Sequence, residues 1–252
     1  MDGLDIALLL GVGIIAGGWN AIAGGATLCS FPVLMAVGLP PVVANATNFL
    51  AVAPANLFAL PPYLPELRKL GRKLIPILSV SGIGALIGSA LLVVSDPSIF
   101  EVLVPFLLLV ATLLFVAGER LRVGLLSLAG DQGSERIIFV ALFVVSIYGG
   151  YFGAGVGVIL LALGQLLGFS DFHVANAIKN ATATCFMVLS INLFGLSGLI
   201  AWPEAATMMV GSAMGGYAGG RFAKHVNQTA LRIAVTVFGF SLSAVYFYRV
   251  FA

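Results

Sequence analysis

Two pairs of polar residues stand out because they lie inside long apolar stretches of the chain. Asn45 and Asn48 are three residues apart, and Asn176 and Lys179 repeat that spacing 131 positions later. Residues three apart share a face of a helix, so each pair would point in one direction. Amides and an ammonium group supply hydrogen-bond donors, and neither stretch contains an Asp or Glu. This set predicts a binding site for an anion, with Lys179 as its positive charge.

A simpler interpretation of the same residues remains open. Counted from a helix start near Phe172, Lys179 lies about 10 Å inside the helix. A lysine side chain is long enough to extend from there to the aqueous interface. Asn45 and Asn176 would then serve as hydrogen-bonding contacts between helices.

Two glycine-rich segments, 17–25 and 149–157, interrupt the longest apolar stretches at matching places. Non-helical backbone at membrane depth persists only where protein or a water-filled cavity satisfies its polar groups. Helices that begin after such breaks would add positive dipole ends and free N–H groups. Close helix packing is the alternative reason for these glycines. The predicted substrate-binding residues are Asn45, Asn48, Asn176, Lys179, Asn20, Tyr151, Gly24, Gly25, Gly155 and Gly157.

The composition indicates a membrane protein. Hydrophobic residues make up 60% of the chain and charged residues only 9%, against about 25% charged residues in a soluble domain. Apolar stretches of spanning length recur throughout the sequence. The two cysteines lie in apolar segments and the two histidines are scattered, so we expect no catalytic residues, metal, cofactor or nucleic acid.

An internal repeat predicts the architecture. Residues 18–88 match 149–219 without a gap. The basic loop precedes the glycine-rich helix in the first copy, at 68–73, and follows it in the second, at 221–224. A duplicated membrane unit whose loop charges change sides is typical of inverted repeats in transporters. We therefore predict an all-α polytopic membrane protein with inverted-topology repeats at 1–120 and 132–252, each a glycine-broken helical hairpin plus three transmembrane helices.

The basic residues suggest an orientation. If the loops around 68–73, 120–136 and 221–232 are cytoplasmic, ten of the twelve Lys and Arg residues lie inside, as the positive-inside rule requires. Segments 4–37 and 137–167 must then each enter and leave on one side as hairpins. The alternative is that both are long tilted helices, in a chain with eight crossings.

The paired Val-Ala-Asn-Ala runs at 43–46 and 174–177, the two glycine breaks and the Gly-x-x-x-Gly helices resemble the TauE/SafE family of sulfite exporters and related permeases. The resemblance covers essentially the whole chain. It implies a multi-pass transporter of sulfur-containing anions in the bacterial inner membrane. It also implies that Asn45, Asn48, Asn176 and Lys179 lie in the substrate region.

The function expected from these observations is export of a small sulfur-containing oxyanion from the cytoplasm by alternating access. Its partners would be that anion and the lipid bilayer, and a homodimer is left open. An anion channel and a proton-coupled sulfonate uptake permease are the alternatives. A purely structural membrane subunit would leave Lys179 and the glycine breaks without a role.

Overall fold

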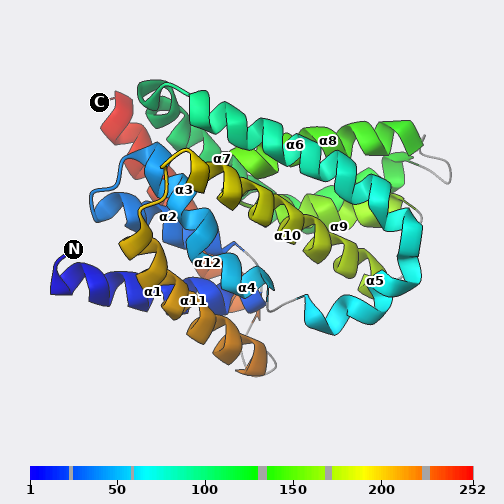
Figure 1. Cartoon of the computed structure of the whole chain (residues 1–252), viewed down its shortest axis with the longest axis horizontal. Helices are drawn as coiled ribbons and strands as arrows, with labels where there is room; N and C mark the ends of the chain where they lie inside the picture. The colour runs from blue at the N-terminus through cyan, green and yellow to red at the C-terminus, as the bar shows by residue number, and fades with distance from the viewer. Residues whose placement is uncertain (23–24, 58–59, 130–134, 168–171, 223–227, 252) are drawn as a thin grey trace.

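The computed structural model describes residues 1–22, 25–57, 60–129, 135–167, 172–222 and 228–251. Within these ranges the chain is a bundle of helices and contains no strand (Figure 1). The helices are α1 (Gly3–Ile22), α2 (Ala26–Ala36), α3 (Pro41–Ala51), α4 (Ala53–Leu57), η1 (Pro61–Tyr63), α5 (Leu64–Leu70), η2 (Gly71–Lys73), α6 (Leu74–Val94), α7 (Pro97–Ala129), α8 (Glu135–Tyr151), α9 (Val156–Leu166), α10 (Phe172–Leu196), α11 (Trp202–Phe222) and α12 (Gln228–Phe251).

The outside of the bundle is apolar, which suits a lipid environment. Leu196 is 88% exposed and Val94 is 77% exposed. Five stretches of the described residues are long and apolar enough to cross a bilayer: Gly3–Asn20, Leu64–Val94, Pro97–Gly118, Val174–Leu196 and Ile233–Phe251. An all-helical, polytopic membrane protein is therefore confirmed.

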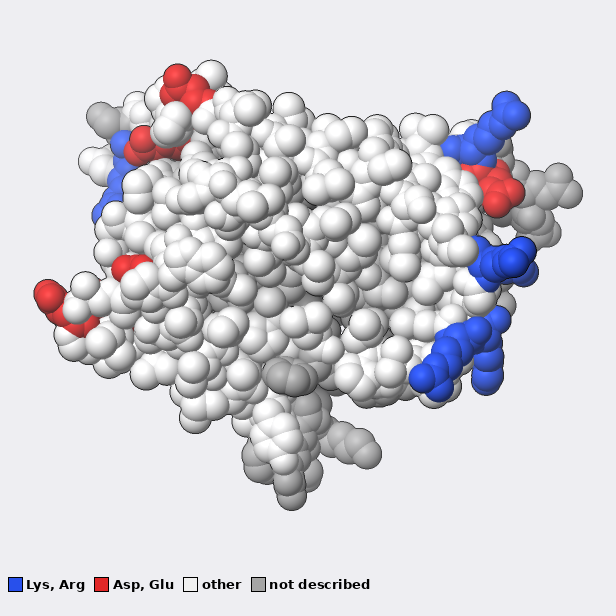
Figure 2. Space-filling view, viewed as in Figure 1, with Lys and Arg blue, Asp and Glu red and all other residues white. Residues whose placement is uncertain are grey.

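Charged side chains gather mainly at two opposite ends of the bundle, with an apolar middle (Figure 2). The four basic residues within 68–73 are exposed on α5 and η2, at the same end as Arg136 at the start of α8; we call this the basic end. The N-terminus and the turn between α6 and α7 lie at the other end (Figure 1), which we call the acidic end; they carry the exposed Asp2 and Asp96. Here the Asp96 carboxylate accepts hydrogen bonds from the Ser98 hydroxyl at 2.6 Å and the Ser98 N–H at 2.8 Å. These hydrogen bonds cap the N-terminus of α7 and lower the pKa of Asp96.

A glycine with left-handed backbone conformation lies between α1 and α2, and another lies between α8 and α9. Gly25, with φ +89°, precedes α2, and Gly155, with φ +75°, precedes α9. A Cβ at Gly155 would also lie 2.9 Å from the Ala111 carbonyl oxygen on α7. Figure 1 shows α2 returning alongside α1, and α9 returning alongside α8. Each predicted glycine break is therefore a helix–break–helix unit that folds back on itself.

Glycine also lets α1 pack along α11, and α6 along α8, at very short range. A Cβ at Gly88 would collide with the Ile147 carbonyl on α8, and one at Gly215 would collide with the Ile14 carbonyl on α1. Any larger residue at these positions would force the backbones apart. The Gly-x-x-x-Gly helices α6 and α11 therefore pack backbone to backbone against their neighbours, as small-xxx-small motifs do.

One apolar stretch of the first half does not form the single span that its length predicts. Residues 42–60 divide into α3 and the short α4, followed by η1 and α5, whereas α10 in the second half runs without interruption for 25 residues. Prolines at 54, 61, 62 and 65 explain the difference, because proline removes a helical N–H and clashes with the preceding turn. We call residues 61–73 the proline arm.

Candidate functional site

The second glycine break packs against both α2 and α3. Phe152, which follows α8, meets Phe31 of α2 edge to face with ring centroids 5.3 Å apart, and both side chains are buried. A Cβ at Gly153, whose φ is +75°, would lie 3.4 Å from the ring of Phe49 on α3. Elements from both halves of the sequence therefore meet at this break.

Asn45 fastens α3 to the end of α8. Its side chain is fully buried, and its Nδ2 donates a hydrogen bond of 2.8 Å to the backbone carbonyl of Tyr151. Tyr151 is the last residue of α8, where carbonyl groups lack helical partners. Within the described part of the chain, the Oδ1 atom of Asn45 is buried without a partner. Asn45 thus offers an acceptor in this conformation, and one of its two N–H groups is committed to the backbone.

Other side chains complete the second break. The Ser89 hydroxyl donates to the Gly150 carbonyl at 3.1 Å, and the Tyr148 hydroxyl donates to the Ala154 carbonyl at 2.8 Å. Buried carbonyls that lose their helical partners are costly in an apolar environment. Side chains from α3, α6 and α8 supply the missing donors, so the break is a specific feature of the fold.

Asn48 binds the first turn after the other break. Its Nδ2 donates to the Thr27 hydroxyl at 3.2 Å, and its Oδ1 accepts a hydrogen bond from Ser30. Ser30 also bonds the Ala26 carbonyl of its own helix, as its helical position predicts. The Asn48 amide therefore joins α3 to the start of α2.

Lys179 takes the corresponding place in the second half. It lies half-buried on α10, and a Cβ at Gly157 would be 3.8 Å from its Cδ atom. Gly157 belongs to the first turn of α9, so the lysine stem runs along the start of the helix after the second break. Among the residues that the structure describes, no carboxylate pairs with this ammonium. A lone cation and a helix N-terminus make this region attractive to an anion.

Asn176, one turn before Lys179, bonds a residue that the sequence does not single out. Its Nδ2 donates to the phenol oxygen of Tyr63 in η1. The run Pro61-Pro62-Tyr63-Leu64-Pro65 signals irregular backbone. No local pattern reveals that Tyr63 would meet a residue 113 positions away.

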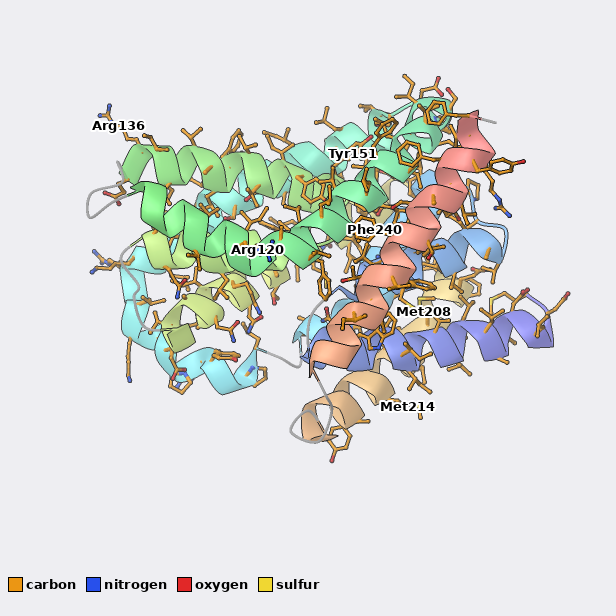
Figure 3. The ribbon with its side chains drawn as sticks, turned by 180° about the vertical axis from the view of Figure 1, so that it is seen from behind. Arg120, Arg136, Tyr151, Met208, Met214 and Phe240 are labelled. Carbon is orange, nitrogen blue, oxygen red and sulfur yellow. The ribbon has the colours of Figure 1, made fainter. Side chains whose placement is uncertain are left out.

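The remaining predicted residues have different surroundings. Asn20 is half-buried in the last turn of α1. The ring of Tyr151 packs on Phe100 with centroids 5.6 Å apart, and its hydroxyl lies 3.4 Å from the Ser95 hydroxyl. Figure 3 shows Tyr151 and Arg136 at opposite ends of α8. Tyr151 therefore contributes its carbonyl to the break and directs its ring toward the acidic end. Gly24 lies outside the described residues.

The described residues hold no cluster of His, Cys, Asp or Glu that could bind a metal ion. Cys29 and Cys185 are free thiols, one buried and one half-buried. The arrangement provides donors, one acceptor and one cation, so it is suited to binding rather than bond-breaking chemistry.

The sequence of this chain matches a known family. A sequence model described as sulfite exporter TauE/SafE covers residues 9–246. The chain belongs to the TauE/SafE family. A relative from Haemophilus influenzae, a probable membrane transporter protein, is 32% identical, over 96% of this chain and 94% of its own length.

More distant relatives carry similar names. The probable membrane transporter protein YfcA of Escherichia coli K12 is 25% identical, over 96% of this chain and 89% of its own length. The probable membrane transporter protein ORF9 of a Sinorhizobium species is 26% identical, over 86% of this chain and 83% of its own length. No solved structure matches the chain. This TauE/SafE protein is thus a membrane transporter by family.

Proposed function

We propose that this protein exports a small sulfur-containing oxyanion, such as sulfite or an organosulfonate, by alternating access. The observation that carries the proposal is Lys179, half-buried and without a carboxylate partner among the described residues, beside the first turn of α9. A buried cation needs a counter-charge, and a bound anion would provide it. The family description names a sulfite exporter, and sulfite is an anion that a lysine side chain can bind.

The proposed transport cycle rests on two inverted repeats, residues 1–120 and 132–252. The helix contacts support this division, because a shift of 131 residues converts the α1–α11 pair into the α8–α6 pair. The same shift relates Asn48, which contacts the first turn of α2, to Lys179, which contacts the first turn of α9. In such proteins the substrate lies between the repeats, and one repeat moves relative to the other.

The proposed direction is outward across a bacterial inner membrane, with the basic end in the cytoplasm. The positive-inside rule supports this orientation. An interior-negative potential favours export of each negative charge by about 2.3 kcal/mol per 100 mV. Export of an anion therefore needs no coupling ion.

Proton-coupled uptake is the second candidate function, and the position of the Glu66 carboxylate favours it. The Oε2 atom of Glu66 on α5 is buried and has no hydrogen-bond partner within the described ranges. Proton-coupled transporters use carboxylates within the membrane as proton relays. An inward proton gradient should accelerate sulfite uptake into proteoliposomes under this mechanism, and should not do so for uncoupled export.

Counterflow of labelled sulfite in proteoliposomes tests the proposed function. A carrier accelerates entry of labelled sulfite when the vesicles are preloaded with unlabelled sulfite, whereas a channel does not. Replacing Lys179 by Ala should weaken sulfite binding by roughly 2–5 kcal/mol, and Lys179→Arg should keep part of the affinity. Arg249→Ala, at an exposed position of α12, is the control. Wild-type affinity in Lys179→Ala would contradict the proposed site.

A further inference from the structure

The proline arm has no counterpart in the second half of the chain. Residues 61–73 form η1, α5 and η2, whereas the residues 131 positions later begin within the continuous helix α10. The arm packs on α10 through η1 and α5. Its first element places Tyr63 against Asn176, three residues before Lys179 and on the same helix face.

The arm also carries the strongest positive charge on the described surface. All four basic residues within 68–73 are exposed at the basic end (Figure 2). Clustered cations raise the local concentration of anions near them. A cationic surface, the Tyr63–Asn176 bond and Lys179 thus follow one another from the basic end into α10.

We propose that the proline arm is the gate on the cytoplasmic side of the anion site and that the Tyr63–Asn176 hydrogen bond closes it. The inference rests on the function proposed above. In this conformation, one of the two N–H groups of the Asn176 side chain donates to the Tyr63 oxygen. An anion beside Lys179 that accepts a hydrogen bond from this same N–H group displaces the Tyr63 oxygen, and its binding then frees the arm.

The first test uses Tyr63→Phe in the purified full-length protein, with sulfite as the ligand. Phenylalanine keeps the ring and removes the oxygen, so Asn176 no longer has to give up a hydrogen bond before it binds the anion. One neutral hydrogen bond corresponds to an affinity gain of roughly two- to tenfold. Tyr246→Phe, at a half-buried tyrosine of α12, is the matched control and should leave sulfite affinity unchanged.

Two outcomes would overturn the gate. Tyr63→Phe with a lower melting temperature and unchanged sulfite affinity would make the bond a structural tie only. Weaker sulfite binding would make Tyr63 part of the anion site itself. If Lys179→Ala lowers affinity while Tyr63→Phe does not alter it, the gate fails and the proposed site stands; if neither variant alters affinity, both fail.

A second measurement needs no variant. In the wild-type protein, saturating sulfite should increase amide hydrogen exchange in residues 61–73, because the arm loses its bond to α10. Exchange at the α6–α8 interface, which contains Gly88, should stay constant and serves as the internal reference. Unchanged or slower exchange in the arm would refute the release of Tyr63.

Discussion

The hydrogen bond between Asn45 and Tyr151 allows a quantitative prediction about the thermal stability of the protein. Asn45→Ala removes a 2.8 Å hydrogen bond between a fully buried amide and the Tyr151 carbonyl at the end of α8. The carbonyl then stays buried without a donor, at a cost of roughly 1–3 kcal/mol. We therefore expect Asn45→Ala to act mainly on stability, because it removes the N–H group that bonds the backbone.

The assay is thermal unfolding of the detergent-purified protein with and without sulfite. At about 2–4 °C per kcal/mol for a chain of this size, the melting temperature should fall by several degrees. Asn45→Asp should be worse, because it keeps the shape but replaces the donor by an acceptor facing the Tyr151 carbonyl. Asn192→Ala is the control, since this exposed residue of α10 bonds only the Val188 carbonyl of its own helix.

A contrary result is equally specific. If Asn45→Ala melts at the same temperature as Asn192→Ala but binds sulfite more weakly, the Asn45 donor serves the substrate. The assignment of Asn45 to the break would then be wrong.

Two further predictions concern the second break and the orientation. Gly155→Ala should lower the melting temperature, because φ +75° is strained for alanine and the new Cβ would lie 2.9 Å from the Ala111 carbonyl; Gly11→Ala, in open space on α1, should be neutral or slightly stabilising. Equal melting temperatures would contradict this account of the break. Cysteine substituted at Asp96 should react with a membrane-impermeant maleimide from the periplasm, and cysteine at Lys69 should not; the reverse pattern would refute the proposed orientation.

The sequence alone determined the class of the molecule and its main local features. Low charge and long apolar stretches require a membrane, because such a chain cannot cover itself with polar groups. The glycine runs predicted both breaks, since left-handed backbone and close helix contact favour a residue without a Cβ. The spacing of Asn45, Asn48, Asn176 and Lys179 correctly placed each pair on one helix.

The tertiary structure decided what those polar residues bind. Asn45 meets a carbonyl 106 residues away, and Asn176 meets a tyrosine 113 residues away. The division of residues 42–60 into α3 and α4 likewise overrides an apolar pattern that suits a continuous span. Sequence periodicity reports which face of a helix a residue occupies. The partner on that face depends on how distant helices pack, and for Asn45 that packing brings its amide against the Tyr151 carbonyl at the end of α8.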